Sequence, residues 1–161
     1  MIVADSSTLI LLAKIGIIDK VLEKIKGEII IPEEVKVEIV RGKTTDALLL
    51  EKRMEMGKIK IRKADLKLKG SVSEDFNLGD GEAEVIAFAI ENKVSVMVDD
   101  KKAIKACKVF GIEFVTSLGL VVNMVKRGFI EREESERLID QLAIYGRYSE
   151  ELIKKAREEL K

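Results

Sequence analysis

Short apolar runs alternate with longer segments of helical periodicity along most of this chain. The apolar runs, which we expect to form strands, are residues 2–4, 28–31, 59–62, 94–98 and 113–115. Between them, apolar residues recur at the spacing of one helix face, as in amphipathic helices. Strands that alternate with helices form a parallel sheet covered by helices on both faces. The pattern therefore predicts an α/β fold.

The expected helices are marked by their apolar spacing and by glycine or proline near their ends. The first is expected at 6–25, with a break near Gly16. The others are 32–41, 45–56, 80–91, 101–110, 117–126, 133–143 and 149–160. Residues 63–77 show the least regular pattern of the chain.

Proline and acidic residues mark the start of the second of these helices. Pro32 fits its first turn, where Glu33 and Glu34 are favourable at the positive end of the helix dipole. Three β-branched side chains are expected to face the core: Val35, Ile39 and Val40.

The composition is that of one globular domain spanning residues 1–161. The chain has 47% hydrophobic and 36% charged residues, which is enough apolar material for a core. It has no run long enough to span a membrane, no visible secretory signal and one cysteine, so we expect a cytoplasmic protein. Lys and Glu dominate the charges while Trp and His are absent, as in thermophilic proteins.

Acidic residues follow two of the predicted strands. Asp5 ends the first apolar run, and Asp99 and Asp100 end the run 94–98. Because the carboxyl ends of parallel strands share one edge of the sheet, these acids are expected to lie together. Glu38 and Glu82 lie on predicted helices instead, and their direction is open at this point.

A site built from these acids contains only oxygen donors, because the chain has no histidine. Such a site suits Mg²⁺ or Mn²⁺ and excludes Ser-His-Asp and Cys-His catalysis. A divalent ion offsets the repulsion among carboxylates and activates water for phosphate chemistry. The hydroxyl groups of Ser6, Ser7 and Thr8 are candidates for holding a water molecule or a phosphate oxygen.

Each acid also has a purely structural alternative. Asp5, and one of the Asp99–Asp100 pair, would be ordinary N-caps of the helices that follow them. Glu82 and Glu84, taken alone, fit surface charges near a helix N-terminus. Glu38 taken alone fits a solvated helix charge.

Two further features of the chain are its one cysteine and a cluster of basic residues. Cys107, flanked by helix formers, is expected to fill the core rather than to act as a nucleophile. Basic residues cluster in the middle of the chain, either to contact phosphates or as a solvated surface. They are Lys52, Arg53, Lys58, Lys60, Arg62, Lys63, Lys67 and Lys69.

Taken in order, these segments resemble the PIN-domain family, and in particular its VapC-like branch labelled DUF3368. The matching segments are IVADSSTLI at 2–10, IPEEV with Glu38 at 31–38, LGDGEAE with Ile86 and Ala87 at 78–87, VDDKKA at 98–103, TSLG at 116–119 and GFI at 128–130. The order and spacing of these segments are specific, although no single one is.

The resemblance implies a Rossmann-like three-layer α/β/α sandwich with a central, mostly parallel sheet. It also implies an Mg²⁺- or Mn²⁺-dependent ribonuclease, the toxin of a type II toxin–antitoxin pair, that forms homodimers and is blocked by a small cognate antitoxin. The family's catalytic acids carry over onto Asp5, Glu38, Glu82 and the pair Asp99 and Asp100. Of these, Asp5, Glu82, Asp99 and Asp100 are the metal-ligand candidates, and the choice within the last pair stays open.

Three other functions compete with the nuclease. A phosphatase of the haloacid dehalogenase type also places an Asp after its first strand, but it needs a second Asp where this chain has Ser7. A response-regulator receiver domain needs an acidic pair before its phosphoacceptor strand and a lysine late in the sheet, and neither is evident. A non-catalytic PIN scaffold that binds a partner is the third, and the intact set of acids argues against it.

Overall fold

The computed structural model describes residues 1–161 and contains a five-stranded sheet in which every pairing is parallel. The strands are β1 (Ile2–Ala4), β2 (Ile29–Pro32), β3 (Ile59–Arg62), β4 (Ser95–Met97) and β5 (Phe114–Val115). Their order across the sheet is β3-β2-β1-β4-β5. The central strand β1 therefore lies beside β4, although two strands and six helices separate them in sequence. The predicted α/β fold with a parallel sheet is confirmed.

Ten helices connect and follow the strands. They are α1 (Ser6–Lys14), α2 (Ile18–Lys24), α3 (Glu33–Gly42), α4 (Thr45–Glu55), α5 (Leu66–Phe76), α6 (Asp80–Asn92), α7 (Lys101–Phe110), α8 (Ser117–Lys126), α9 (Arg132–Tyr145) and α10 (Glu150–Glu159). None of them is long and apolar enough to cross a membrane.

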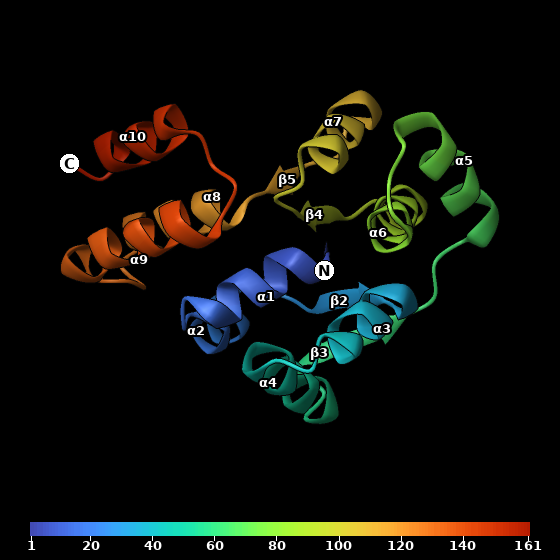
Figure 1. Cartoon of the computed structure of the whole chain (residues 1–161), viewed down its shortest axis with the longest axis horizontal. Helices are drawn as coiled ribbons and strands as arrows, with labels where there is room; N and C mark the ends of the chain where they lie inside the picture. The colour runs from blue at the N-terminus through green and yellow to red at the C-terminus, as the bar shows by residue number, and fades with distance from the viewer. The chain divides into compact units, whose positions relative to one another are not determined.

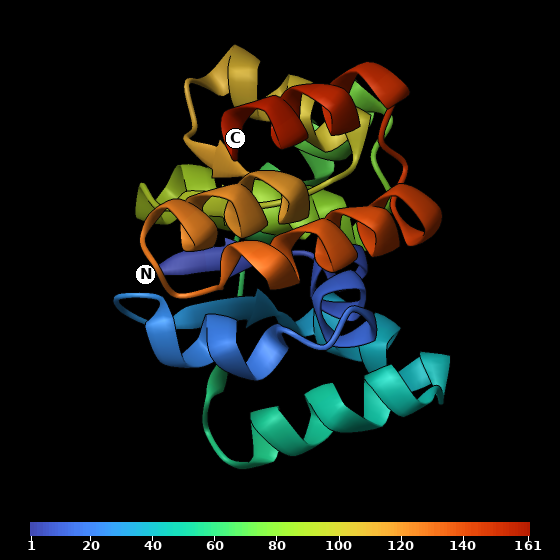
Figure 2. The same ribbon diagram turned by 90° about the vertical axis from the view of Figure 1, so that its left-hand side faces the viewer.

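The chain divides into two compact units, Met1–Val115 and Thr116–Lys161. The first unit holds the whole sheet, with the strands lying between α1, α2 and α4 on one side and α5 and α6 on the other (Figure 1). The second unit consists of α8, α9 and α10, which pack against one another and are seen side by side in orange to red (Figure 2). The prediction of one domain over residues 1–161 stays a prediction.

Apolar side chains fill both sides of the sheet. Residues 29–32 of β2 are all buried, as expected for a strand covered on both faces. Cys107 is fully buried on α7, and burial raises the pKa of its thiol to about 11. A thiol held in this protonated form is a poor nucleophile, so the predicted core role of Cys107 is confirmed.

The structure corrects the predicted description of three segments. Residues 63–77 contain the helix α5, capped by Asp65, whose carboxylate accepts the Leu68 N–H at 2.8 Å. Its apolar pattern is weak because Val72 is its only buried residue.

Pro32 ends β2 and is the N-cap of α3 rather than part of its first turn. Val40 is 41% exposed, since it lies beyond the helix face that buries Val35 and Ile39.

Candidate active site

Asp5 and Asp99 meet where the central strands end. Ala4 of β1 pairs with Met97 of β4, and the Asp5 N–H donates to the Met97 carbonyl at 3.3 Å. Thr8, in the first turn of α1, donates its hydroxyl to Asp99 Oδ2 at 3.0 Å. Strand pairing and this cross-link from the following helix thus hold the two acids at one edge of the sheet, as the order of the strands predicts.

The Asp5 carboxylate is almost completely buried and caps α1. Its Oδ1 accepts the Thr8 N–H at 2.8 Å, and Ser7 donates its hydroxyl to Oδ2 at 3.3 Å. Burial raises the pKa of Asp5 to about 7; the hydrogen bonds from Thr8 oppose this rise, and repulsion from Asp99 and Glu82 adds to it. Asp5 therefore does cap α1, as its structural alternative proposed. Its burial and its acidic neighbours are not needed for a helix cap.

Glu38 reaches the site from the second half of α3. Its Oε2 accepts the Ser6 hydroxyl at 2.5 Å, and its Oε1 accepts the Gly81 N–H at 3.1 Å. A Cβ at position 81 would overlap this carboxylate, so glycine is required for the close approach. Glu38 is thus held between α1 and α6 rather than solvated, which the sequence left open.

Glu82 lies in the first turn of α6, and Asp100 is the N-cap of the neighbouring helix α7. Glu82 accepts the Gly79 N–H at 2.9 Å, and Asp100 caps α7 by accepting the Ala103 N–H at 2.9 Å. The pKa of Glu82 is raised, first by partial burial and then by repulsion from Asp100 and Glu38. Because Glu82 repels Asp5 as well, it links the Asp5–Asp99 pair to the Asp100–Glu38 pair electrostatically.

The three hydroxyl groups predicted to hold water or phosphate all donate to acids of this cluster. Ser6 donates to Glu38, Ser7 to Asp5 and Thr8 to Asp99. In this arrangement they fix the orientation of the carboxylates, and a phosphate oxygen would have to displace one of these bonds. Their predicted role toward substrate stays a prediction.

The donor chemistry of the cluster fits a hard divalent cation. All candidate ligands are carboxylates, and the buried Asp5 has other acids as its charged neighbours, a repulsion that a cation would offset. The acids are nevertheless spread out, since no group of three or more of them lies close enough together to hold one ion. Mg²⁺ usually keeps several waters and needs only one or two protein carboxylates, so the donor set still fits this ion.

Glu84 is the residue whose place was misjudged from sequence. It was weighed as a surface charge, yet it is only 5% exposed, and its Oε2 accepts the Glu34 N–H in the first turn of α3 at 2.8 Å. A weak signal was present in the sequence. The N-cap of α3 is a proline, Pro32, which has no side-chain acceptor, so its first turn needed an acceptor from elsewhere.

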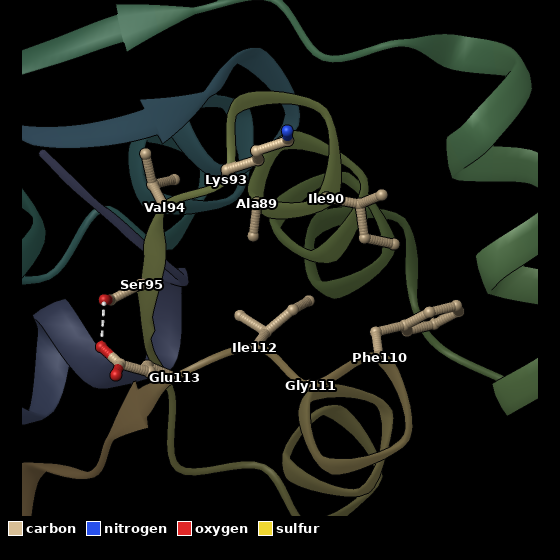
Figure 3. A pocket seen from close by; sticks show the side chains of 9 residues that line it. All are labelled: Ala89, Ile90, Lys93, Val94, Ser95, Phe110, Gly111, Ile112 and Glu113. Atoms are coloured by element: carbon tan, nitrogen blue, oxygen red, sulfur yellow. Dashed lines mark hydrogen bonds between the residues drawn. The ribbon is translucent and has the colours of Figure 1, made fainter.

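Two other features lie apart from the acids. A pocket of about 320 Å³ between the ends of α6 and α7 lies where β4 and β5 begin, at the opposite edge of the sheet (Figure 3). In the basic cluster, Arg53 binds Asp19 through two nitrogens and Lys69 pairs with Asp80, so part of its charge is already balanced within the protein.

Comparison with known proteins yields one match. The sequence model of the family DUF3368, described as a PIN domain, matches residues 1–161. No curated protein matches the chain.

Proposed function

Because the chain belongs to the PIN-domain family, whose fold is generally that of a nuclease, we propose that it is a metal-dependent endoribonuclease that hydrolyses RNA phosphodiester bonds. The observation that carries this proposal is the gathering of five mutually repelling acids at the carboxyl edge of the sheet: the buried Asp5 lies next to Asp99 and Glu82, and Glu82 next to Asp100 and Glu38. A purely structural cluster would gain nothing from this repulsion.

In the proposed site, Asp5, Glu82, Asp99 and Asp100 would hold Mg²⁺ or Mn²⁺, with Glu38 beside them. A bound divalent ion supplies a Lewis acid for the phosphoryl group and lowers the pKa of water. The protein's own groups orient the acids, since Thr8 positions Asp99 and Ser6 positions Glu38. We assign Asp99 to the Asp5 side of the site and Asp100 to the Glu82 side.

The wider role that we propose is that of a cytoplasmic toxin in a type II toxin–antitoxin pair. It would act as a homodimer and be blocked by a small cognate antitoxin. Support for this part is the resemblance of the sequence to the VapC-like branch, while the family match over residues 1–161 supports the PIN domain itself.

The test is cleavage of single-stranded RNA by the purified protein with Mn²⁺ or Mg²⁺, with and without EDTA, beside Asp5→Asn. We expect cleavage that requires the ion and is lost in Asp5→Asn. Cleavage that survives both EDTA and Asp5→Asn would refute the metal mechanism. Rapid turnover of a small phosphomonoester without RNA cleavage would favour the phosphatase.

A non-catalytic PIN scaffold that binds a partner is the second candidate. No three of the acids lie close enough to share an ion, although one or two carboxylates suffice for Mg²⁺. The two functions differ in RNA cleavage, which is measured together with Mn²⁺ binding by calorimetry. The nuclease binds Mn²⁺ through Asp5 and cleaves RNA, whereas the scaffold leaves RNA intact at every Mn²⁺ concentration.

A further inference from the structure

The helices α3 and α6 cap each other's first turns. Glu84 of α6 accepts the Glu34 N–H of α3 at 2.8 Å, and Glu38 of α3 accepts the Gly81 N–H of α6 at 3.1 Å. The first N–H groups of a helix have no partner within the helix and attract anionic acceptors. Each helix therefore supplies a carboxylate that accepts an otherwise unpaired N–H group in the first turn of the other helix.

The N-caps of both helices leave their first turns without a side-chain cap of their own. The N-cap of α3 is Pro32 and that of α6 is Gly79, and neither supplies a side-chain hydrogen bond to its own helix. By contrast, α1, α4, α5, α7, α8 and α10 are all capped by an Asp, Ser or Thr side chain. The two helices that bear Glu38 and Glu82 are thus positioned by contacts with each other.

Glu84, like Asp5 of the site, is a buried carboxylate. Glu84 lies on the buried face of α6 and is 5% exposed, and a buried carboxylate costs free energy even when it accepts a hydrogen bond. An apolar side chain of the same size would fill this space at lower cost. Stability alone therefore gives a weak reason for a glutamate at this position.

We infer that Glu84 is a positioning residue: by holding the Glu34 N–H, it sets where α3 begins and so places Glu38 one helical turn later against Gly81 and Ser6. The inference rests on the proposed function, because Glu38 matters only if the acids form a working site. Glu38 then has three constraints, with one on its helix backbone and one on each carboxylate oxygen.

The decisive variants are Glu84→Met, which keeps the volume and loses the acceptor, and Glu84→Gln, which keeps an acceptor oxygen. With metal-free protein, hydrogen exchange of the Gly81 and Glu34 amides reports the two capping bonds directly. We expect both amides to exchange faster in Glu84→Met and at nearly the wild-type rate in Glu84→Gln.

The same variants are then compared in Mn²⁺ affinity and RNA cleavage. Loss of a residue that orients a ligand costs about 10- to 100-fold in metal affinity or activity, so we expect a fall of that size in Glu84→Met and recovery in Glu84→Gln. The fall should be in kcat, with KM for RNA nearly unchanged, at a temperature where the melting curves show both variants to be fully folded.

Three outcomes separate this inference from the proposed function. If the wild type cleaves RNA and Glu84→Met matches it in cleavage and amide exchange, the inference is wrong and the function stands. If Glu84→Gln loses as much as Glu84→Met at equal melting temperature, the acceptor role is wrong. If the wild type neither binds Mn²⁺ nor cleaves RNA, the proposed function fails, and the inference fails with it.

Discussion

Replacing Asp5 by Asn should stabilise the metal-free protein while abolishing its response to metal. Asn keeps the shape of the side chain and an oxygen for the Thr8 N–H, and it is as good an N-cap as Asp. What it removes is a buried negative charge whose neighbours include Asp99 and Glu82. The substitution therefore isolates the electrostatic cost of the site from the helix cap.

The size of this cost follows from the pKa of Asp5, which is raised from 3.8 to about 7. Because the folded state holds the proton more tightly than the unfolded state, Asp5 contributes stability below pH 4 that is lost as the pH rises through 7. The full loss is about 4 kcal/mol, of which about 2 to 3 kcal/mol falls between pH 5 and pH 8. In Asp5→Asn this loss does not occur.

The assay is urea unfolding followed by circular dichroism at pH 5, 6, 7 and 8, in buffers containing EDTA. The difference in unfolding free energy, Asp5→Asn minus wild type, should grow by about 2 to 3 kcal/mol from pH 5 to pH 8. Taking the difference cancels the titration of all groups that the two proteins share.

Asp65→Asn is the matched control. Asp65 caps α5 through the same kind of bond, to the Leu68 N–H at 2.8 Å, but it is exposed to solvent. Asp65→Asn should therefore not stabilise the protein at pH 8. If the Asp5→Asn difference stays constant across the pH range, or if Asp65→Asn stabilises equally, the argument from a buried, repelled carboxylate is refuted.

Three further predictions concern the metal, the glycine beside Glu38 and the core. Saturating Mn²⁺ at pH 8 should raise the unfolding free energy of the wild type by about 3 kcal/mol at 100 times its dissociation constant; calorimetry checks this, and no rise would contradict the metal site. Gly81→Ala should lower Mn²⁺-dependent RNA cleavage about 100-fold, since its Cβ displaces Glu38. The control Gly70→Ala, whose Cβ meets open space in α5, should keep activity and gain about 0.5–1 kcal/mol. In urea unfolding, Ile39→Ala should cost about 2–5 kcal/mol and the exposed Val40→Ala less than about 0.5 kcal/mol; equal costs would mean that the buried face of α3 is misassigned.

Most helices and strands could be predicted from the sequence because their apolar periodicity is local. The helix α7 begins at Lys101 and ends at Phe110, as expected from its apolar spacing and the glycine that follows. The helix α5 was missed, because a helix that buries one residue leaves almost no periodic signal. Val40 was misplaced because it neighbours the buried Ile39 in sequence but not on the helix face.

The approach of Asp5 to Asp99 could also be predicted from the sequence. The strand order fixes the positions of acids that directly follow parallel strands, and right-handed connections largely determine that order. Their roles as ligands stay predictions that the variants above test.

The sequence by itself thus determined the α/β class, the position of most helices and strands, and an oxygen-only chemistry through the absence of histidine. Only the tertiary structure decided where Glu38 and Glu82 lie, and that Glu84 is buried. The physical reason is that strand ends are placed by backbone pairing along the sheet, whereas the direction of a side chain on a helix depends on how that helix packs. For α3 and α6, that packing includes contacts between residues far apart in the chain, such as that from Glu84 to the Glu34 N–H.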